Sequence, residues 1–124
     1  MKLSHGEAFG APVLRIEGYV DPEDAPVLEQ AAWEAFGDSG TRIVLDLELC
    51  NHIGSVGLGV LFSLVRWARA KQGCVIAISP RTQLFRLLQL VQLTDEDGFH
   101  VFKDLDGARQ MILARCTEEG CERD

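Results

Sequence analysis

Ser55 is the residue in this sequence best placed to do chemistry. It lies in the segment G-S-V-G-L-G, residues 54–59, directly before an apolar helical pattern. A serine at a helix start caps the helix, because its hydroxyl accepts a hydrogen bond from a free backbone N–H for about 1 kcal/mol. The same place suits a phosphate, since the helix dipole and free N–H groups stabilise its charge of about −1.5 to −2. We therefore expect Ser55 to be a helix N-cap, in a position that permits a phosphorylation switch.

Gly57 and Gly59 follow Ser55 inside the same predicted helix. Each costs about 1 kcal/mol relative to alanine there, which suggests that something approaches this backbone closely. The segment lacks the lysine of a P-loop. It also lacks G-x-G-x-x-G spacing, because Phe62 occupies the last glycine position. A nucleotide site is therefore not predicted.

The remaining reactive side chains form no catalytic or metal-binding pattern. His5, His52 and His100 lie in separate segments, and a triad would also need an orienting acid and an oxyanion hole. His52 is expected to be a partly exposed loop residue. The cysteines form no C-x-x-C pair and have no histidine at metal-ligand spacing; they are Cys50, Cys74, Cys116 and Cys121. We predict reduced thiols, no metal, no cofactor and no enzymatic activity.

These residues must be positioned by a small α/β domain. The 124 residues are 47% hydrophobic and 25% charged, which indicates a single domain over residues 1–124 with one core at about 12–114. Residues 117–124 are expected to be a flexible acidic tail. The elements predicted from periodicity and breakers are strands at 13–16, 42–47, 74–78 and 99–102, a loop at 50–54, and helices at 24–36, 55–72, from 79–80 onward and 105–114. This alternation predicts a mixed sheet of four to five strands flanked by about four helices.

The second predicted helix has two distinct faces. At about 100° per residue, one face turns towards the sheet; its members are Val60, Leu61, Leu64, Val65 and Ala68. Of these, Leu61, Leu64 and Val65 are expected to share one core with Val44, Leu45, Val75 and Ile76. Ser55, Gly59, Phe62 and Arg66 lie on the other side. Phe62 either caps the core edge or anchors a partner, and the pattern leaves both interpretations open.

The charge of the chain limits its partners. The formal net charge is −7 and the pI is about 4.9, so phosphate backbones and anionic lipids repel it, whereas a basic protein does not. Residues 1–10 contain no apolar signal region, and the most apolar run, residues 56–65, is too short to cross a bilayer. We expect a cytoplasmic protein that binds neither nucleic acid nor membrane. Homo-oligomerisation is left open.

Several segments together resemble STAS domains of the anti-sigma factor antagonist family. The central match is I-V-L-D-L followed by I-G-S-V-G-L-G-V-L, at residues 43–47 and 53–61, which is similar to the family's strand and D-S-[ST]-G-L-G-V-L junction. Further matches are G-Y-V-D at 18–21, A-P-V-L at 25–28, Q-G-C at 72–74, S-P at 79–80 and L-F-R-L-L at 84–88. The resemblance covers residues 12–114.

The resemblance implies a regulatory function. In the antagonist branch, an anti-sigma factor with serine kinase activity phosphorylates the serine that corresponds to Ser55. The unphosphorylated form binds that kinase and frees the sigma factor, and a PP2C-type phosphatase resets the cycle. The partner-binding residues implied are Asp21, Gly54, Val56, Gly57, Leu58, Gly59, Phe62 and Arg66. Alternatives are a soluble STAS subunit of an ABC-type lipid transporter, or a STAS scaffold that is not modified.

Two residues next to Ser55 depart from the family pattern. Gly54 replaces the aspartate before the serine, and Val56 replaces the small hydroxyl residue after it. Losing the carboxylate either weakens recognition by a kinase or marks a branch that binds its partner constitutively.

Overall fold

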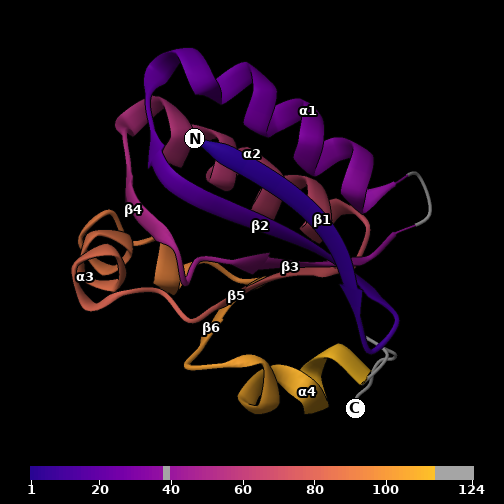
Figure 1. The fold of residues 1–124 in the computed structure, drawn as a ribbon. Helices are drawn as coiled ribbons and strands as arrows, with labels where there is room; N and C mark the ends of the chain where they lie inside the picture. Colours follow the sequence, from indigo (N-terminus) through magenta and orange to yellow (C-terminus); the bar gives the residue numbers. More distant parts are fainter. Residues whose placement is uncertain (38–39, 114–124) are drawn as a thin grey trace.

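The computed structural model describes residues 1–37 and 40–113 and places in them six strands and four α-helices around one sheet (Figure 1). The strands are β1 Lys2–Ala8, β2 Ala11–Val20, β3 Arg42–Asp46, β4 Cys50–Ile53, β5 Cys74–Ile78 and β6 Phe99–Phe102. The helices are α1 Ala25–Phe36, α2 Ser55–Ala70, α3 Thr82–Leu90 and α4 Leu105–Leu113, with short 3₁₀ turns at Pro22–Asp24 and Leu93–Asp95. The predicted α/β class with a mixed sheet is confirmed.

The sheet runs in the order β1-β2-β3-β5-β6, and β4 pairs with the C-terminal end of β2. Strand β1 is antiparallel to β2, and the other strand pairings of the described residues are parallel. Parallel neighbours end at the same edge of a sheet, so the loops after these strands gather there. Both Ser55 and Asp21 follow strands that end at this edge.

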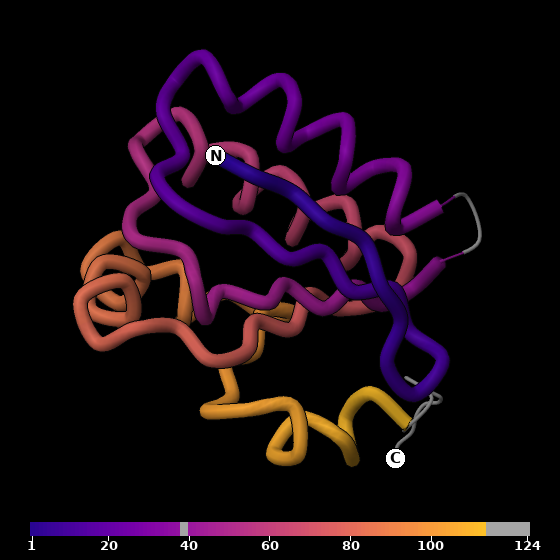
Figure 2. The backbone as a smooth tube through the Cα atoms, viewed as in Figure 1, coloured from indigo at the N-terminus to yellow at the C-terminus, as the bar shows by residue number. Residues whose placement is uncertain are grey.

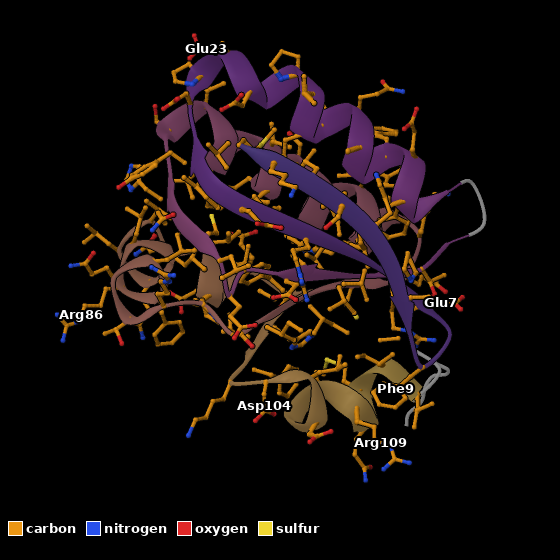
Figure 3. All side chains as sticks on the ribbon, in the orientation of Figure 1. Glu7, Phe9, Glu23, Arg86, Asp104 and Arg109 are labelled. Carbon is orange, nitrogen blue, oxygen red and sulfur yellow. The ribbon has the colours of Figure 1, made fainter. Side chains whose placement is uncertain are left out.

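Strand β1 was not predicted, and the sheet begins at Lys2 and not near residue 12. Its sequence, KLSHGEA, is mostly exposed and lacks an apolar alternation. A two-residue turn forms the hairpin, because Phe9 and Gly10 both adopt positive φ, 52° and 86°, as a tight antiparallel connection requires. Figure 3 shows Phe9 at the tip of this hairpin, near Arg109 of α4, whose guanidinium lies 5.5 Å from the ring centroid. Residues 2–8 therefore form a strand because they pair with β2, and not because of a local sequence pattern.

Two other strand boundaries also differ from the prediction. The first strand was expected at residues 13–16, yet β2 continues to Val20, and Gly18 at φ 86° marks a register irregularity. Residues 50–53 were predicted as a loop but form β4, which brings the sheet to six strands in place of four to five. Only Cys50 and Ile53 of β4 are buried, so the segment shows no continuous apolar pattern.

The helices cover the sheet in two unequal layers (Figures 1 and 2). Side chains of α1, α2 and α3 form the large core on one face, and among the described residues α4 is the helix that packs on the other face. Leu45 and Val75 belong to the large layer, but Val44 and Ile76 belong to the layer under α4. The expectation of one shared core was therefore wrong, because successive side chains of a strand point to opposite faces.

The helix ends largely follow the predicted signals. Asp24 precedes α1, Pro26 lies in its first turn, and Gly37 at φ 74° ends it. Helix α3 begins at Thr82 and not at residue 79, because Ser79 takes a positive φ of 58° and Pro80 precedes an extended Arg81. The predicted end of α4 at Ala114 and the predicted tail lie outside the described residues.

Candidate functional site

Ser55 is the first residue of α2 and is exposed. The N-cap is Gly54, which is extended at φ −73° and ψ 173°, and its carbonyl accepts a hydrogen bond from Leu58 N–H at 2.9 Å. The prediction that Ser55 is the N-cap was therefore wrong by one position, although its place at the helix start is confirmed. The first-turn N–H groups of a helix have no intrahelical acceptor, so the Ser55 hydroxyl lies at a positive helix end.

Asp21 lies next to this helix start. Strands β2 and β4 run in parallel with Val20 opposite Ile53, and Gly54 N–H donates to the Val20 carbonyl at 2.9 Å. The residue after each strand therefore reaches the same place. Asp21 is exposed, and its N–H donates to Asp24 Oδ2 at 2.9 Å, which fixes the turn before α1. Two segments more than thirty residues apart in the sequence thus form one surface around Ser55.

Gly57 and Leu58 were predicted to contact a partner, but both are buried. A Cβ on Gly57 would lie 2.8 Å from Ile53 Cγ2 and 2.9 Å from Val20 Cγ1. The close approach inferred for this glycine is therefore made by the protein's own β2 and β4. Gly57 lets the helix pack against the strand ends, and Leu58 belongs to the core.

Gly59 differs from Gly57, because it is exposed and a Cβ there would meet no atom within 4 Å. Val56 is 49% exposed, and Arg66 is exposed on the same helix. Phe62 is half-buried and packs against the large core, in contrast to Leu61 at 1% exposure. The accessible part of the predicted surface is therefore Ser55, Val56, Gly59 and Arg66, with Phe62 at its boundary. Val60, expected to face the sheet, is only partly buried.

Sequence reasoning did not single out Tyr19, an exposed aromatic residue two positions before Asp21. Tyr19 is 60% exposed near the end of β2 and lies opposite His52 of β4 in the sheet register. His52 is exposed as expected, though in a strand and not in a loop. The position of Tyr19 two residues before Asp21 was the available signal. It was missed because β4 was not predicted and the first strand was expected to end at residue 16.

Cys50 lies beneath this surface and is chemically protected. Burial raises the pKa of its thiol to about 11. The contact with the His52 carbonyl and the charge of nearby Arg81 lower the pKa, but by less than burial raises it. The protonated thiol is a poor nucleophile at neutral pH. Neither Cys50 nor Cys74 forms a disulfide. Within residues 1–37 and 40–113, no three metal-ligating side chains gather.

A family model described as "Mlab, STAS domain" matches residues 4–103, most of the chain. The chain belongs to the STAS domain family. The match starts inside β1 and includes the whole surface around Ser55. In the described part of this STAS chain, no helix is long and apolar enough to span a bilayer.

Named relatives and solved structures agree with this family. The anti-sigma-F factor antagonist RsfB of Mycobacterium tuberculosis is 42% identical over 52 residues, which are 42% of this chain and 43% of RsfB. The match thus spans less than half the length of that relative. The crystal structure of an anti-sigma factor antagonist from Mycobacterium paratuberculosis is 29% identical, with a TM-score of 0.74 over 91% of this chain and 94% of that one. The structure of TM1081 from Thermotoga maritima has a TM-score of 0.81 at 18% identity, over 90% and 95% of the two chains.

Proposed function

We propose that this STAS chain is an anti-sigma factor antagonist, a cytoplasmic binding protein and not an enzyme, which binds an anti-sigma factor with serine kinase activity. The observation that carries the proposal is an exposed serine at the first position of α2, on a surface made by the ends of β2 and β4. The name of RsfB and that of the paratuberculosis protein support the same function.

Phosphorylation of Ser55 is the proposed switch. The unmodified surface offers Val56 and Tyr19, both about half exposed, for an apolar contact with the kinase. A phosphate on Ser55 adds a charge of about −1.5 to −2 at the rim of that contact. The α2 terminus stabilises this charge in the free protein, whereas a bound partner would have to desolvate it. Phosphorylation therefore weakens binding, and a PP2C-type phosphatase restores it.

The direct test is intact-mass analysis after incubation with a candidate kinase and ATP. We expect one phosphate per chain, which is lost in Ser55→Ala and retained in Ser63→Ala, a serine farther along the same helix. Addition of a PP2C-type phosphatase should remove it. A phosphate that persists in Ser55→Ala would contradict the assignment of the site.

Partner affinity tests the switch separately. Ser55→Asp should bind the kinase more weakly than wild type, and Ser55→Ala should bind it constitutively. Equal affinities of these two variants would favour a scaffold that is not modified. The glycine at position 54, where the family pattern has an aspartate, favours the same alternative. Association with a transporter ATPase in place of a kinase would favour the transporter-subunit alternative.

A further inference from the structure

The far edge of the sheet carries a cleft that the function around Ser55 does not use. Within residues 1–37 and 40–113, strand β6 pairs only with β5. A cleft of about 590 Å³ follows this strand over its whole length. Its walls come from β6 and the residue after it, from the start of α3, and from the turn before β6; they are Pro80, Thr82, Phe85, Thr94, Phe99, His100, Val101, Phe102 and Lys103.

The backbone of β6 presents unpaired hydrogen-bonding groups to this cleft. Val75 N–H donates to Gly98 O at 2.7 Å, and Ser79 N–H donates to Phe102 O at 3.0 Å. Since backbone groups alternate in direction along a strand, residues 98, 100 and 102 face β5, and Val101 faces outward. The N–H and C=O of Val101 therefore point to the free edge, in the arrangement that an added strand requires.

The side chains that surround this edge suit an extended apolar segment. Phe85 of α3 and Phe102 of β6 are half-buried in the cleft walls, as is Val101. Because alternate side chains of β6 point to opposite faces, apolar surface lies on both sides of the free edge. An added strand could place its own alternating side chains against both.

The charge of the cleft restricts its occupant further. Lys103 is exposed and is the one lining side chain that carries a full charge, because burial keeps the pKa of His100 low and its ring neutral. The neighbouring Asp104 already accepts a hydrogen bond from Gly107 N–H at 2.7 Å at the start of α4. Figure 3 shows Arg86 directed away from α3 into solvent. Lys103 thus offers one positive charge at the carboxyl end of β6.

We propose that the β6 edge binds an extended segment of a partner protein, which adds a strand to the sheet and places a carboxylate against Lys103. The segment would alternate apolar and polar side chains and carry an acidic residue at the Lys103 end. This proposal does not rest on phosphorylation of Ser55.

Selection from a displayed library of random dodecapeptides on the full chain tests the proposal. Val101→Pro removes the outward N–H and leaves the bonds to β5 intact, since proline is tolerated at such positions of edge strands. Val101→Thr keeps the N–H and is the matched control. We expect wild type and Val101→Thr to enrich alternating apolar peptides with Asp or Glu. Val101→Pro should bind the same peptides at least fivefold more weakly, the effect of one lost hydrogen bond.

Lys103→Glu tests the charge. It should shift the enriched peptides from acidic to basic residues at that end, and amide exchange of Val101 should slow in the bound wild type. No enrichment, or enrichment that Val101→Pro leaves unchanged, would overturn the proposal. The proposal would also be overturned if octanoate, but no peptide, slowed amide exchange of Val101. That result would indicate a small-molecule site. Protection that depends on protein concentration alone would instead indicate pairing of two copies.

Discussion

At the scale of single residues, the position of Ser55 allows its modification to change partner binding without changing the stability of the fold. A serine at the N-cap stabilises a helix with its hydroxyl, so modifying it would also weaken the fold. Here Gly54 occupies the N-cap, and no side-chain bond caps α2. The Ser55 hydroxyl therefore has no capping function to lose when it is phosphorylated. This arrangement suits a switch that changes binding while the fold stays constant.

Replacement of Ser55 by alanine should accordingly have little effect on stability. We expect the free energy of unfolding to change by less than about 0.5 kcal/mol, the range of surface substitutions away from caps. Urea denaturation followed by tryptophan fluorescence measures it. A loss of about 1 kcal/mol or more would show that the hydroxyl caps the helix after all.

His100 should make stability depend on pH. Burial lowers the pKa of its folded-state imidazole below 6.5. Well above pH 6.5 both states are neutral and the residue has no effect on stability. As the pH falls below 6.5, the unfolded chain takes up the proton first, so the free energy of unfolding decreases.

The comparison of wild type with His100→Gln isolates this effect. Between pH 7.5 and 5.5, wild type should lose more stability than the variant, as measured by urea denaturation at each pH. His5→Gln, an exposed position on β1, is the control and keeps His100. Parallel curves for wild type and His100→Gln would show that burial of this ring is too slight to matter.

At the scale of elements, the two glycines of α2 have opposite surroundings, and substitution should separate them. Gly57→Ala drives a Cβ into Ile53 and Val20, so we expect a loss of about 1–3 kcal/mol from overpacking. Gly59→Ala meets open space, and its better helix propensity should stabilise the protein by up to about 1 kcal/mol. Thermal and urea denaturation of the two variants give both values.

The same pair tests whether a partner approaches the backbone at Gly59. If the kinase packs closely there, Gly59→Ala should weaken kinase binding although it stabilises the free protein. Unchanged affinity would place the contact at Val56 and Tyr19 alone.

Elements that a local sequence pattern determines were predicted correctly. Elements that form by pairing with a neighbouring strand were missed. Strand β5 was predicted with its observed bounds, because a short apolar run between Gly73 and Pro80 allows little else. Helix α2 was predicted from its start at Ser55 to within two residues of its end. Strand β1 is polar and β4 is half exposed, and both form because β2 offers hydrogen-bonding groups. Such strands carry no periodic signal.

The same distinction applies to the site. Ser55, Asp21 and Gly59 are exposed, as the motif and the helical angle that indicated them require. Gly57 and Leu58 were placed on the wrong surface, because their packing against Val20 and Ile53 depends on the unpredicted pairing of β4 with β2. Tyr19 was missed for the same reason. Errors about the site thus trace to one missing strand.

At the scale of the whole molecule, the two proposed surfaces lie apart on one sheet. The Ser55 surface follows β2 and β4, and β6 lies three strand positions from β2. At about 4.8 Å per strand, this is about 14 Å. The Ser55 surface and the β6 edge therefore use different strands of the same sheet.

The sheet also joins two cores that share β3 and β5. Helix α4 covers the smaller one, through Ala108 and Ile112. Both tryptophans lie on the other face, where Trp33 of α1 stacks on Trp67 of α2 with ring centroids 4.3 Å apart. Tryptophan fluorescence therefore reports the large layer only, while circular dichroism reports all helices.

Ile112→Ala tests whether the two layers unfold together. The side chain is 1% exposed, so its truncation should cost about 2–4 kcal/mol. Because Val44 and Ile76 under α4 alternate with Leu45 and Val75 of the large core, loosening one face should loosen the strands of both. We expect fluorescence and circular dichroism to show the same lowered midpoint, as a two-state domain requires. Leu113→Ala, 52% exposed on the same helix, should leave the midpoint nearly unchanged. If circular dichroism fell early in Ile112→Ala while fluorescence kept the wild-type midpoint, α4 would unfold as a separate unit, and the sheet would not couple its two faces.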